Sequence, residues 1–228
     1  LVLAFAGTVT EHTGTVTITG SVNVSQLKTI NDATTGDITL EVTSDSLFGT
    51  ASDLADAFAG TVTTHTGTVI ITDEPTASQL KTINDATTGA ITLNDVNGAL
   101  SDSAANLVDA FAGTVTEHTG TVTITDAATI AQLTTIDAET TGTLTYTSVT
   151  DTASNLSTNT GSYVTSNKTV TISEGSAATL TELVNINADT SGAITLSTET
   201  IAANYSGSSA NLVLAFAGTV TTHTGTVT

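Results

Sequence analysis

The sequence predicts an α/β solenoid in which right-handed parallel coils of about 26 residues each carry a short strand and a short helix. Three observations support this fold class. Leucines recur at a nearly constant spacing, each leucine follows a residue that can cap a helix, and each helix is followed by alternating apolar residues and threonines. A parallel β-helix with short helical insertions is the alternative, because the links between the predicted strands alternate in length.

The repeat is read from nine leucines separated by 23 to 29 residues. They are Leu1, Leu27, Leu54, Leu80, Leu107, Leu133, Leu156, Leu183 and Leu212. Two repeat types alternate, one reading LVDAFAGTV and the other SQLKTINDATTG. The chain therefore divides into pairs of about 53 residues, at about 1–53, 54–106, 107–155, 156–211 and a partial 212–228. We expect one continuous solenoid of eight to nine coils over 1–228, forming part of a longer repetitive chain.

Each predicted helix begins at a capping residue four positions before its leucine. These residues are Thr50, Ser103, Thr152 and Ser208 in the first type, and Asn23, Thr76, Thr129 and Thr179 in the second. In the second type Gln or Glu follows three residues later, as in a capping box. Glycines after the leucine predict a C-terminal turn, so helices should span about nine to twelve residues. These glycines are Gly7, Gly60, Gly113 and Gly218, and Gly36, Gly89, Gly142 and Gly192.

A β segment follows each helix, and GTVTIT alternates strictly between apolar residues and threonine. The predicted strands are 15–19, 38–40, 68–72, 91–93, 121–125, 143–146, 169–172 and 194–196. The longer links EVTSDSLFGT and NDVNGALSD could carry an extra strand per pair of coils, and the segment GTVTEHTG after the helix could do the same, as the alternative β-helix requires. Each short segment has an apolar side that is covered only by its neighbours.

Composition excludes several classes of function. The chain has 22 acidic residues, three lysines and a net charge of −19, which disfavours binding to nucleic acid or anionic lipid and suits an extracellular protein in salty water. The absence of cysteine excludes disulfides and thiolate metal sites. No apolar run reaches the length of a membrane span, so we expect no membrane span.

Candidate sites are few, and each recurs with the repeat. The histidines occupy one repeat position, and a spacing of two coils, about 9.6 Å, favours a packing role over a shared metal. They are His12, His65, His118 and His223. Aligned acids are weak metal candidates, namely Asp32, Asp85 and Asp137, and also Asp73 and Asp126. Calcium needs six or more oxygens around one point, so we expect no cofactor beyond weakly bound calcium.

A catalytic triad is a singular geometry, whereas every candidate residue here has near-identical copies, so we expect no catalytic residue, no cofactor-binding residue and no enzyme activity. Outward threonines in T-x-T runs are similar to the ice-binding faces of some antifreeze proteins. Here Val69-Ile70-Ile71 interrupts them.

The runs SDSAANLVDAF, SQLKTINDATTGAITL and DTASNL resemble Thr-, Ala- and Gly-rich tandem repeats of giant secreted cell-surface proteins of bacteria, particularly marine cyanobacteria. The resemblance covers essentially the whole chain and implies no catalytic residue. It implies a structural component of an extracellular filament or cell-surface layer. The stalk of a bacterial adhesin and an ice- or carbohydrate-binding solenoid are the alternatives. The expected partner is the same chain, by end-to-end association or by continuation.

Overall fold

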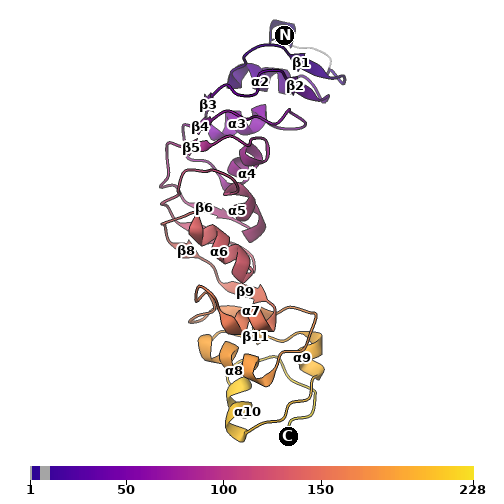
Figure 1. The fold of residues 1–228 in the computed structure, drawn as a ribbon, viewed down its shortest axis with the longest axis vertical. Helices are drawn as coiled ribbons and strands as arrows, with labels where there is room; N and C mark the ends of the chain where they lie inside the picture. The colour runs from indigo at the N-terminus through magenta and orange to yellow at the C-terminus, as the bar shows by residue number, and fades with distance from the viewer. Residues whose placement is uncertain (1, 6–10) are drawn as a thin grey trace. The chain divides into compact units, whose positions relative to one another are not determined.

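The chain is an α/β protein in which parallel strands in several small sheets alternate with short helices (Figure 1). The computed structural model describes residues 2–5 and 11–228, and these residues form no closed barrel. The helices are α1 (Val2–Phe5), α2 (Val24–Asn31), α3 (Ala51–Ala57), α4 (Ala77–Asp85), α5 (Ala104–Ala110), α6 (Ile130–Ala138), α7 (Ala153–Thr158), α8 (Leu180–Asp189), α9 (Thr198–Ala202) and α10 (Ser209–Ala215). The expected alternation of strands and helices is confirmed.

The strands are two to four residues long. They are β1 (Val16–Ile18), β2 (Ile38–Leu40), β3 (Leu47–Gly49), β4 (Val69–Ile71), β5 (Ile91–Leu93), β6 (Leu100–Asp102), β7 (Val122–Ile124), β8 (Leu144–Thr145), β9 (Ser148–Asp151), β10 (Thr169–Ile172) and β11 (Ile194–Thr195). Each predicted strand is present. The extra strands expected in the long links are also present, as β3 and β6, and β9 fills the equivalent link of the third pair.

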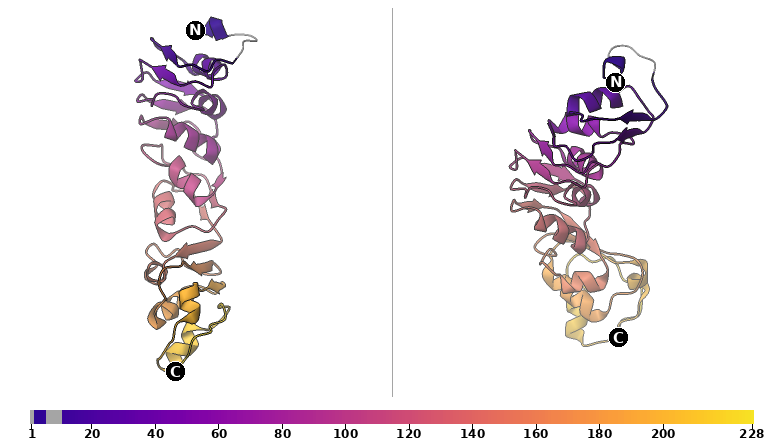
Figure 2. Two further views of the ribbon diagram at one scale, coloured as in Figure 1. Left: turned by 90° about the vertical axis from the view of Figure 1, so that its right-hand side faces the viewer. Right: turned by 45° about the horizontal axis from the view of Figure 1, so that its top comes forward.

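Two compact units divide the chain. The first contains Leu1–Thr123 and Ala138–Leu144, and the second contains Ile124–Asp137 and Thr145–Thr228. Helices and strands alternate in both units (Figure 2). The single continuous solenoid expected over 1–228 stays a prediction.

All eight predicted capping residues begin a helix. Thr50, Ser103, Thr152 and Ser208 each accept a hydrogen bond from the main-chain N–H three residues later. Asn23, Thr76, Thr129 and Thr179 do the same, and the Gln or Glu side chain at that position accepts from the cap's own N–H. These reciprocal bonds satisfy first-turn donors that a helix leaves unpaired.

The helices of the first repeat type are shorter than expected, with seven residues in α3 and α5. Each is followed by a glycine at positive φ, 72° at Gly60 and 75° at Gly113, which turns the chain away from the helix axis. Gly7 lies outside the described residues.

The prediction that the second glycine set ends a helix is wrong. Gly89 lies beyond the bridging residue Thr87, where a neighbouring repeat passes very close. A Cβ atom built on Gly89 would lie 1.9 Å from the carbonyl oxygen of Gly67. This position needs glycine because two main chains approach each other, and not because of its φ angle.

All the strand pairs whose register is known are parallel. The sheet orders are β1-β2, β3-β4-β5, β6-β7-β8 and β11-β10-β9. Val69 pairs with Leu47 on one side and with Ile91 on the other, 22 residues away in each direction. Isolated bridges such as Ile38 with Val62 and Ile91 with Val115 extend these ladders. The strands that follow second-type helices, such as β2 and β5, therefore have a hydrogen-bonded neighbour on each side. β3 and β6 each begin a new ladder.

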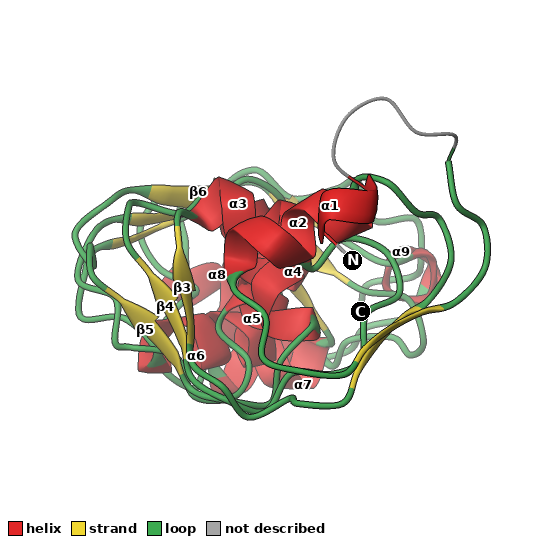
Figure 3. Ribbon diagram, turned by 90° about the horizontal axis from the view of Figure 1, so that it is seen from above, coloured by secondary structure: helices red, strands yellow, loops and turns green. Residues whose placement is uncertain are grey.

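The core lies between the helices and the inward side of the strands. In the first unit, α2, α3 and α4 lie over one another beside β3, β4 and β5 (Figure 3). Four repeat leucines of this unit are fully buried, with 0% exposure at Leu27, Leu54, Leu80 and Leu107. Burying one such side chain contributes about 1.5–3 kcal/mol, so each helix depends on its neighbours for stability.

Candidate functional site

The histidines at the shared repeat position each pack against a phenylalanine seven residues earlier. The ring centroids are 5.9 Å apart for Phe5–His12 and Phe58–His65, 6.0 Å for Phe111–His118 and 5.2 Å for Phe216–His223. Phe58 and Phe111 follow the last residues of α3 and α5, and the glycines described above turn the chain back so that the imidazole reaches the ring. Each histidine is therefore packed against a phenylalanine of its own repeat.

Three of these imidazoles also bind the preceding main chain. The Nε2 atom lies 2.8 Å from the carbonyl oxygen of Asp45 in His65, 2.9 Å from that of Gly98 in His118 and 2.7 Å from that of Ala203 in His223. A carbonyl oxygen only accepts, so Nε2 carries the proton and donates. His65 and His118 are only 2% exposed, and burial lowers the pKa of both side chains. The rings of His65 and His118 are therefore held as neutral donors.

Main-chain hydrogen bonds join each of three histidines to the repeat that follows. His65 N–H donates to the carbonyl oxygen of Ala86 at 2.9 Å, and its own carbonyl oxygen accepts from Thr88 N–H at 2.9 Å and from Thr87 Oγ1 at 3.0 Å. His12 makes the same bonds to residues 33–35, and His118 makes them to residues 139–141. We call this set of bonds the His–Thr contact.

A helix-to-helix contact that sequence reasoning missed is made by asparagines at the ends of second-type helices. Asn84 Nδ2 lies 2.8 Å from the carbonyl oxygen of Asp109, 3.3 Å from that of Ala110 and 2.6 Å from that of Ala112. Asn31 and Asn187 reach the ends of α3 and α10 in the same way. These amides satisfy carbonyls that the last turn of a helix leaves free.

Two lysines bridge the same pairs of helices. Lys81 Nζ lies 2.7 Å from Asp85 in its own helix and 2.9 Å from Asp109 in the next. Lys28 is paired in the same way with Asp32 and Asp56. The carboxylates raise the pKa of both ammonium groups, through the hydrogen bond to Asp56 for Lys28 and to Asp85 for Lys81. Two of the three cations therefore support contacts between repeats.

The aligned acids proposed as metal ligands have different partners. Asp32 and Asp85 pair with the lysines described above. Asp137 stands four residues after its leucine, where Asn31 and Asn84 stand, so its alignment with Asp32 and Asp85 is off by one residue. It accepts a hydrogen bond from Tyr163 Oη at 3.0 Å, because a carboxylate cannot donate as the asparagines do.

The second acidic pair lies after strands. Asp73 Oδ1 accepts from the N–H of Ala51 at 2.7 Å, at the start of α3, and Asp126 is exposed after β7. Over residues 2–5 and 11–228 no group of three or more His, Asp or Glu is placed to hold a metal ion. The candidate acids are accordingly spread over helix ends and strand ends.

The outward side of the sheets differs from one sheet to the next. Thr150, Thr171 and Thr195 form a cross-strand row on β9, β10 and β11. On β3, β4 and β5 the equivalent row is Phe48, Ile70 and Thr92, and Phe48 is 70% exposed. A uniform threonine face, as an ice-binding surface requires, is therefore interrupted in the first unit.

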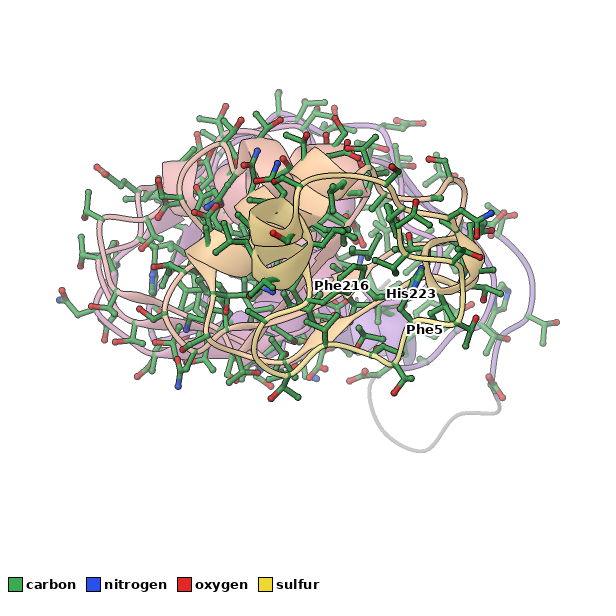
Figure 4. All side chains as sticks on the ribbon, turned by 90° about the horizontal axis from the view of Figure 1, so that it is seen from below. Phe5, Phe216 and His223 are labelled. Atoms are coloured by element: carbon green, nitrogen blue, oxygen red, sulfur yellow. The ribbon has the colours of Figure 1, made fainter. Side chains whose placement is uncertain are left out.

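Two surface hollows lie along the repeats in the described part of the chain. One of about 360 Å³ is lined by Phe58 and residues 59–62, 64, 82, 85 and 86, and its carboxylate, Asp85, is paired with Lys81. Another of about 320 Å³ is lined by Phe216, His223 and residues 220–222, 225 and 227. Its ring pair is labelled in Figure 4.

A recurring set of residues in the sequence indicates the contacts between helices of successive repeats. Lysine one residue and asparagine four residues after Leu27 and Leu80 recur together with aspartate two residues after Leu54 and Leu107.

No helix in the described part of the chain is long and apolar enough to cross a bilayer. No family model matches the chain, and no curated protein or solved structure matches it.

Proposed function

We propose that this chain is a structural component of an extracellular filament or cell-surface layer, built from tandem solenoid repeats, rather than an enzyme. The observation that carries the proposal is the His–Thr contact, which recurs at His12, His65 and His118 with the same bonds. This contact between one coil and the next is made three times in the first unit, whereas an active site needs a singular arrangement of groups.

The proposed solenoid has right-handed parallel coils averaging about 26 residues, as right-handed crossovers are the rule for parallel strands. Its support is the register, in which paired strands lie 22 residues apart in β1–β2, β3–β4 and β4–β5. Coils that contain β3 or β6 carry two strands beside their helix, which favours a combination of the expected fold with the alternative β-helix.

An extracellular location is supported by charge. A net charge of −19 produces self-repulsion that salt screens, and two of the lysines are placed where they neutralise acids of adjacent helices. The same architecture would serve the stalk of an adhesin, whose binding tip would be a separate domain.

Two measurements test the proposal. Antibodies raised against this chain should label the outside of intact, unpermeabilised cells of the producing organism in immunogold electron microscopy. Labelling confined to permeabilised cells would overturn the location. Small-angle X-ray scattering of the purified chain should give the pair-distance distribution of a rod, and the distribution of a sphere would overturn the solenoid.

A further inference from the structure

The loop between β5 and β6 contains Asn97-Gly98, the only asparagine in the chain that is followed by glycine. The side chain of Asn97 is exposed, and the side chain of Glu74 occupies the space beside Gly98 where a Cβ atom would lie. Because glycine has no side chain, nothing on residue 98 itself obstructs the approach of its nitrogen to the amide carbon of Asn97.

The contacts of the Asn97 amide favour attack by the main chain that follows it. Among the residues that the structure describes, neither the N–H of Gly98 nor Nδ2 of Asn97 makes a hydrogen bond. The hydroxyl oxygen of Thr119 lies 2.7 Å from Oδ1 of Asn97 and 3.1 Å from the carbonyl oxygen of Val96. A hydroxyl has one proton, and the shorter distance favours donation to Oδ1. A donor at this position stabilises negative charge that develops on Oδ1.

We propose that Asn97 is a site of spontaneous deamidation in the folded chain, assisted by the hydroxyl of Thr119. The nitrogen of Gly98 loses its proton to hydroxide and bonds to Cγ of Asn97. The bond from Cγ to Nδ2 then breaks, and ammonia leaves with a proton from water. One water molecule opens the resulting succinimide ring, which yields aspartate or isoaspartate at position 97. The net reaction consumes one water and releases one ammonia, and it requires no oxidant, cofactor or enzyme.

The isoaspartate product changes a contact between two coils. Its main chain passes through the former side chain of residue 97 and is longer by one carbon atom. On one side of Asn97 the carbonyl oxygen of Gly98 accepts from Nε2 of His118 at 2.9 Å. On the other side the carbonyl oxygen of Val96 accepts from the N–H of Thr119 at 2.8 Å. An extra carbon between these two bonds must displace at least one of them.

The affected bond holds a residue that also contacts the next coil. His118 makes the His–Thr contact with residues 139–141, so its bond to Gly98 links three successive segments of the first unit. The product also adds a carboxylate close to Asp95, whose Oδ1 accepts from the N–H of Asn97 at 3.1 Å. Lost bonds and like-charge repulsion both weaken this joint, so its strength should fall with the age of the protein.

Peptide mapping by mass spectrometry tests the reaction on the full chain. After incubation of the folded protein at mildly alkaline pH, we expect the amide to be replaced by a carboxyl group at Asn97 before any other asparagine changes. The neighbouring Asn94, which is followed by Asp95, is the control within the same digest. If Asn97 stays intact in the folded chain over the time in which it converts in the urea-unfolded chain, the proposal is wrong.

The variant Thr119→Val tests the assistance by the hydroxyl. In the folded chain it should convert about two- to tenfold more slowly, because it lacks one hydrogen bond to Oδ1. In urea, where the contact is absent, both chains should convert at the same rate. Thr119→Ser keeps the hydroxyl and should retain the original rate. Equal or faster conversion of folded Thr119→Val would overturn the role of Thr119.

Urea denaturation tests the effect on the joint. The isoaspartate form, isolated from incubated protein by anion exchange, should unfold at a lower urea concentration than the fresh chain. Asn97→Ser is the matched control, since Ser44 has this position in the first pair, where His65 bonds to the residue that follows it. This variant should keep its midpoint through the same incubation. An isoaspartate form with the midpoint of the fresh chain would overturn the weakening of the joint.

Discussion

The Nε2 atom of His118 lies 2.9 Å from the carbonyl oxygen of Gly98, 20 residues earlier in the chain, and donates a hydrogen bond to it. His65 makes the same bond to Asp45 over the same separation in sequence. In His118 the other ring nitrogen is buried without a hydrogen-bond partner, so protonation there would place a charge with nothing to receive its proton.

Stability should therefore fall as the pH falls through the histidine range. Burial lowers the pKa of His65 and His118, and the nearby Asp45, Asp95 and Glu74 only partly oppose it. Above about pH 6.5 both histidines are neutral in the folded and in the unfolded chain. Below this pH the unfolded chain binds protons at these histidines that the folded chain does not bind, so the folded state loses stability. Denaturant titrations between pH 8 and 5 at fixed salt should give a decreasing free energy of unfolding, by at most about 1.4 kcal/mol per pH unit for each histidine.

The double variant His65→Gln, His118→Gln should flatten this dependence, because an amide does not titrate in this range. His12→Gln, at an exposed ring, is the matched control and should keep the slope. A double variant with an unchanged slope would assign the pH dependence to other groups.

Asn84 should be important for the contact between α4 and α5. Asn84→Ala removes three hydrogen bonds to carbonyl oxygens, and we expect it to lower the free energy of unfolding by about 2 kcal/mol. Asn84→Asp should cost more, because a carboxylate cannot donate and its charge lies at the negative end of α5. Urea denaturation measures both.

Asp137→Asn is the comparison for these variants. Tyr163 Oη can donate to an amide oxygen as it does to the carboxylate, so the change should be close to neutral. If Asp137→Asn destabilises the chain as much as Asn84→Asp does, the explanation that Asn84 must donate whereas Asp137 only accepts is wrong.

The lysine bridge should contribute much less than the asparagine. Lys81 is 30% exposed and its partners Asp85 and Asp109 are 60% and 49% exposed, so solvent screens both pairs. We expect Lys81→Met to cost no more than about 1 kcal/mol, and the cost to shrink as salt is added. The midpoint of urea denaturation at low and high salt measures it, and a cost that does not depend on salt would point to packing of the lysine stem instead.

The parts of this fold that follow from local chemistry could be predicted from the sequence. Thr76 with Gln79 forms the expected capping box, since a capping box lies within four residues and requires no knowledge of the rest of the chain. The metal hypothesis for Asp137 used an alignment off by one residue, which a count from the repeat leucine would have corrected, whereas its contact with Tyr163 appears only in the structure. The roles of Asn84 and Gly89 depend on residues 22 to 28 positions away, and these become neighbours only when the register is known.

Gly89 gives the sharpest test of how closely successive repeats approach. Gly89→Ala would put a methyl group 1.9 Å from the carbonyl oxygen of Gly67, which is main chain and cannot rotate away. We expect the free energy of unfolding to fall by about 3 kcal/mol or more. Gly20→Ala is the matched control, because no atom lies within 4 Å of its Cβ position, and it should change stability by no more than about 0.5 kcal/mol.

Gly60→Ala separates the two reasons for glycine in this chain. Its Cβ meets no atom closer than 3.9 Å, so only its φ of 72° opposes the change, at about 1–2 kcal/mol. Equal losses at Gly60 and Gly89 in urea denaturation would mean that the repeats are not packed main chain to main chain at Gly67.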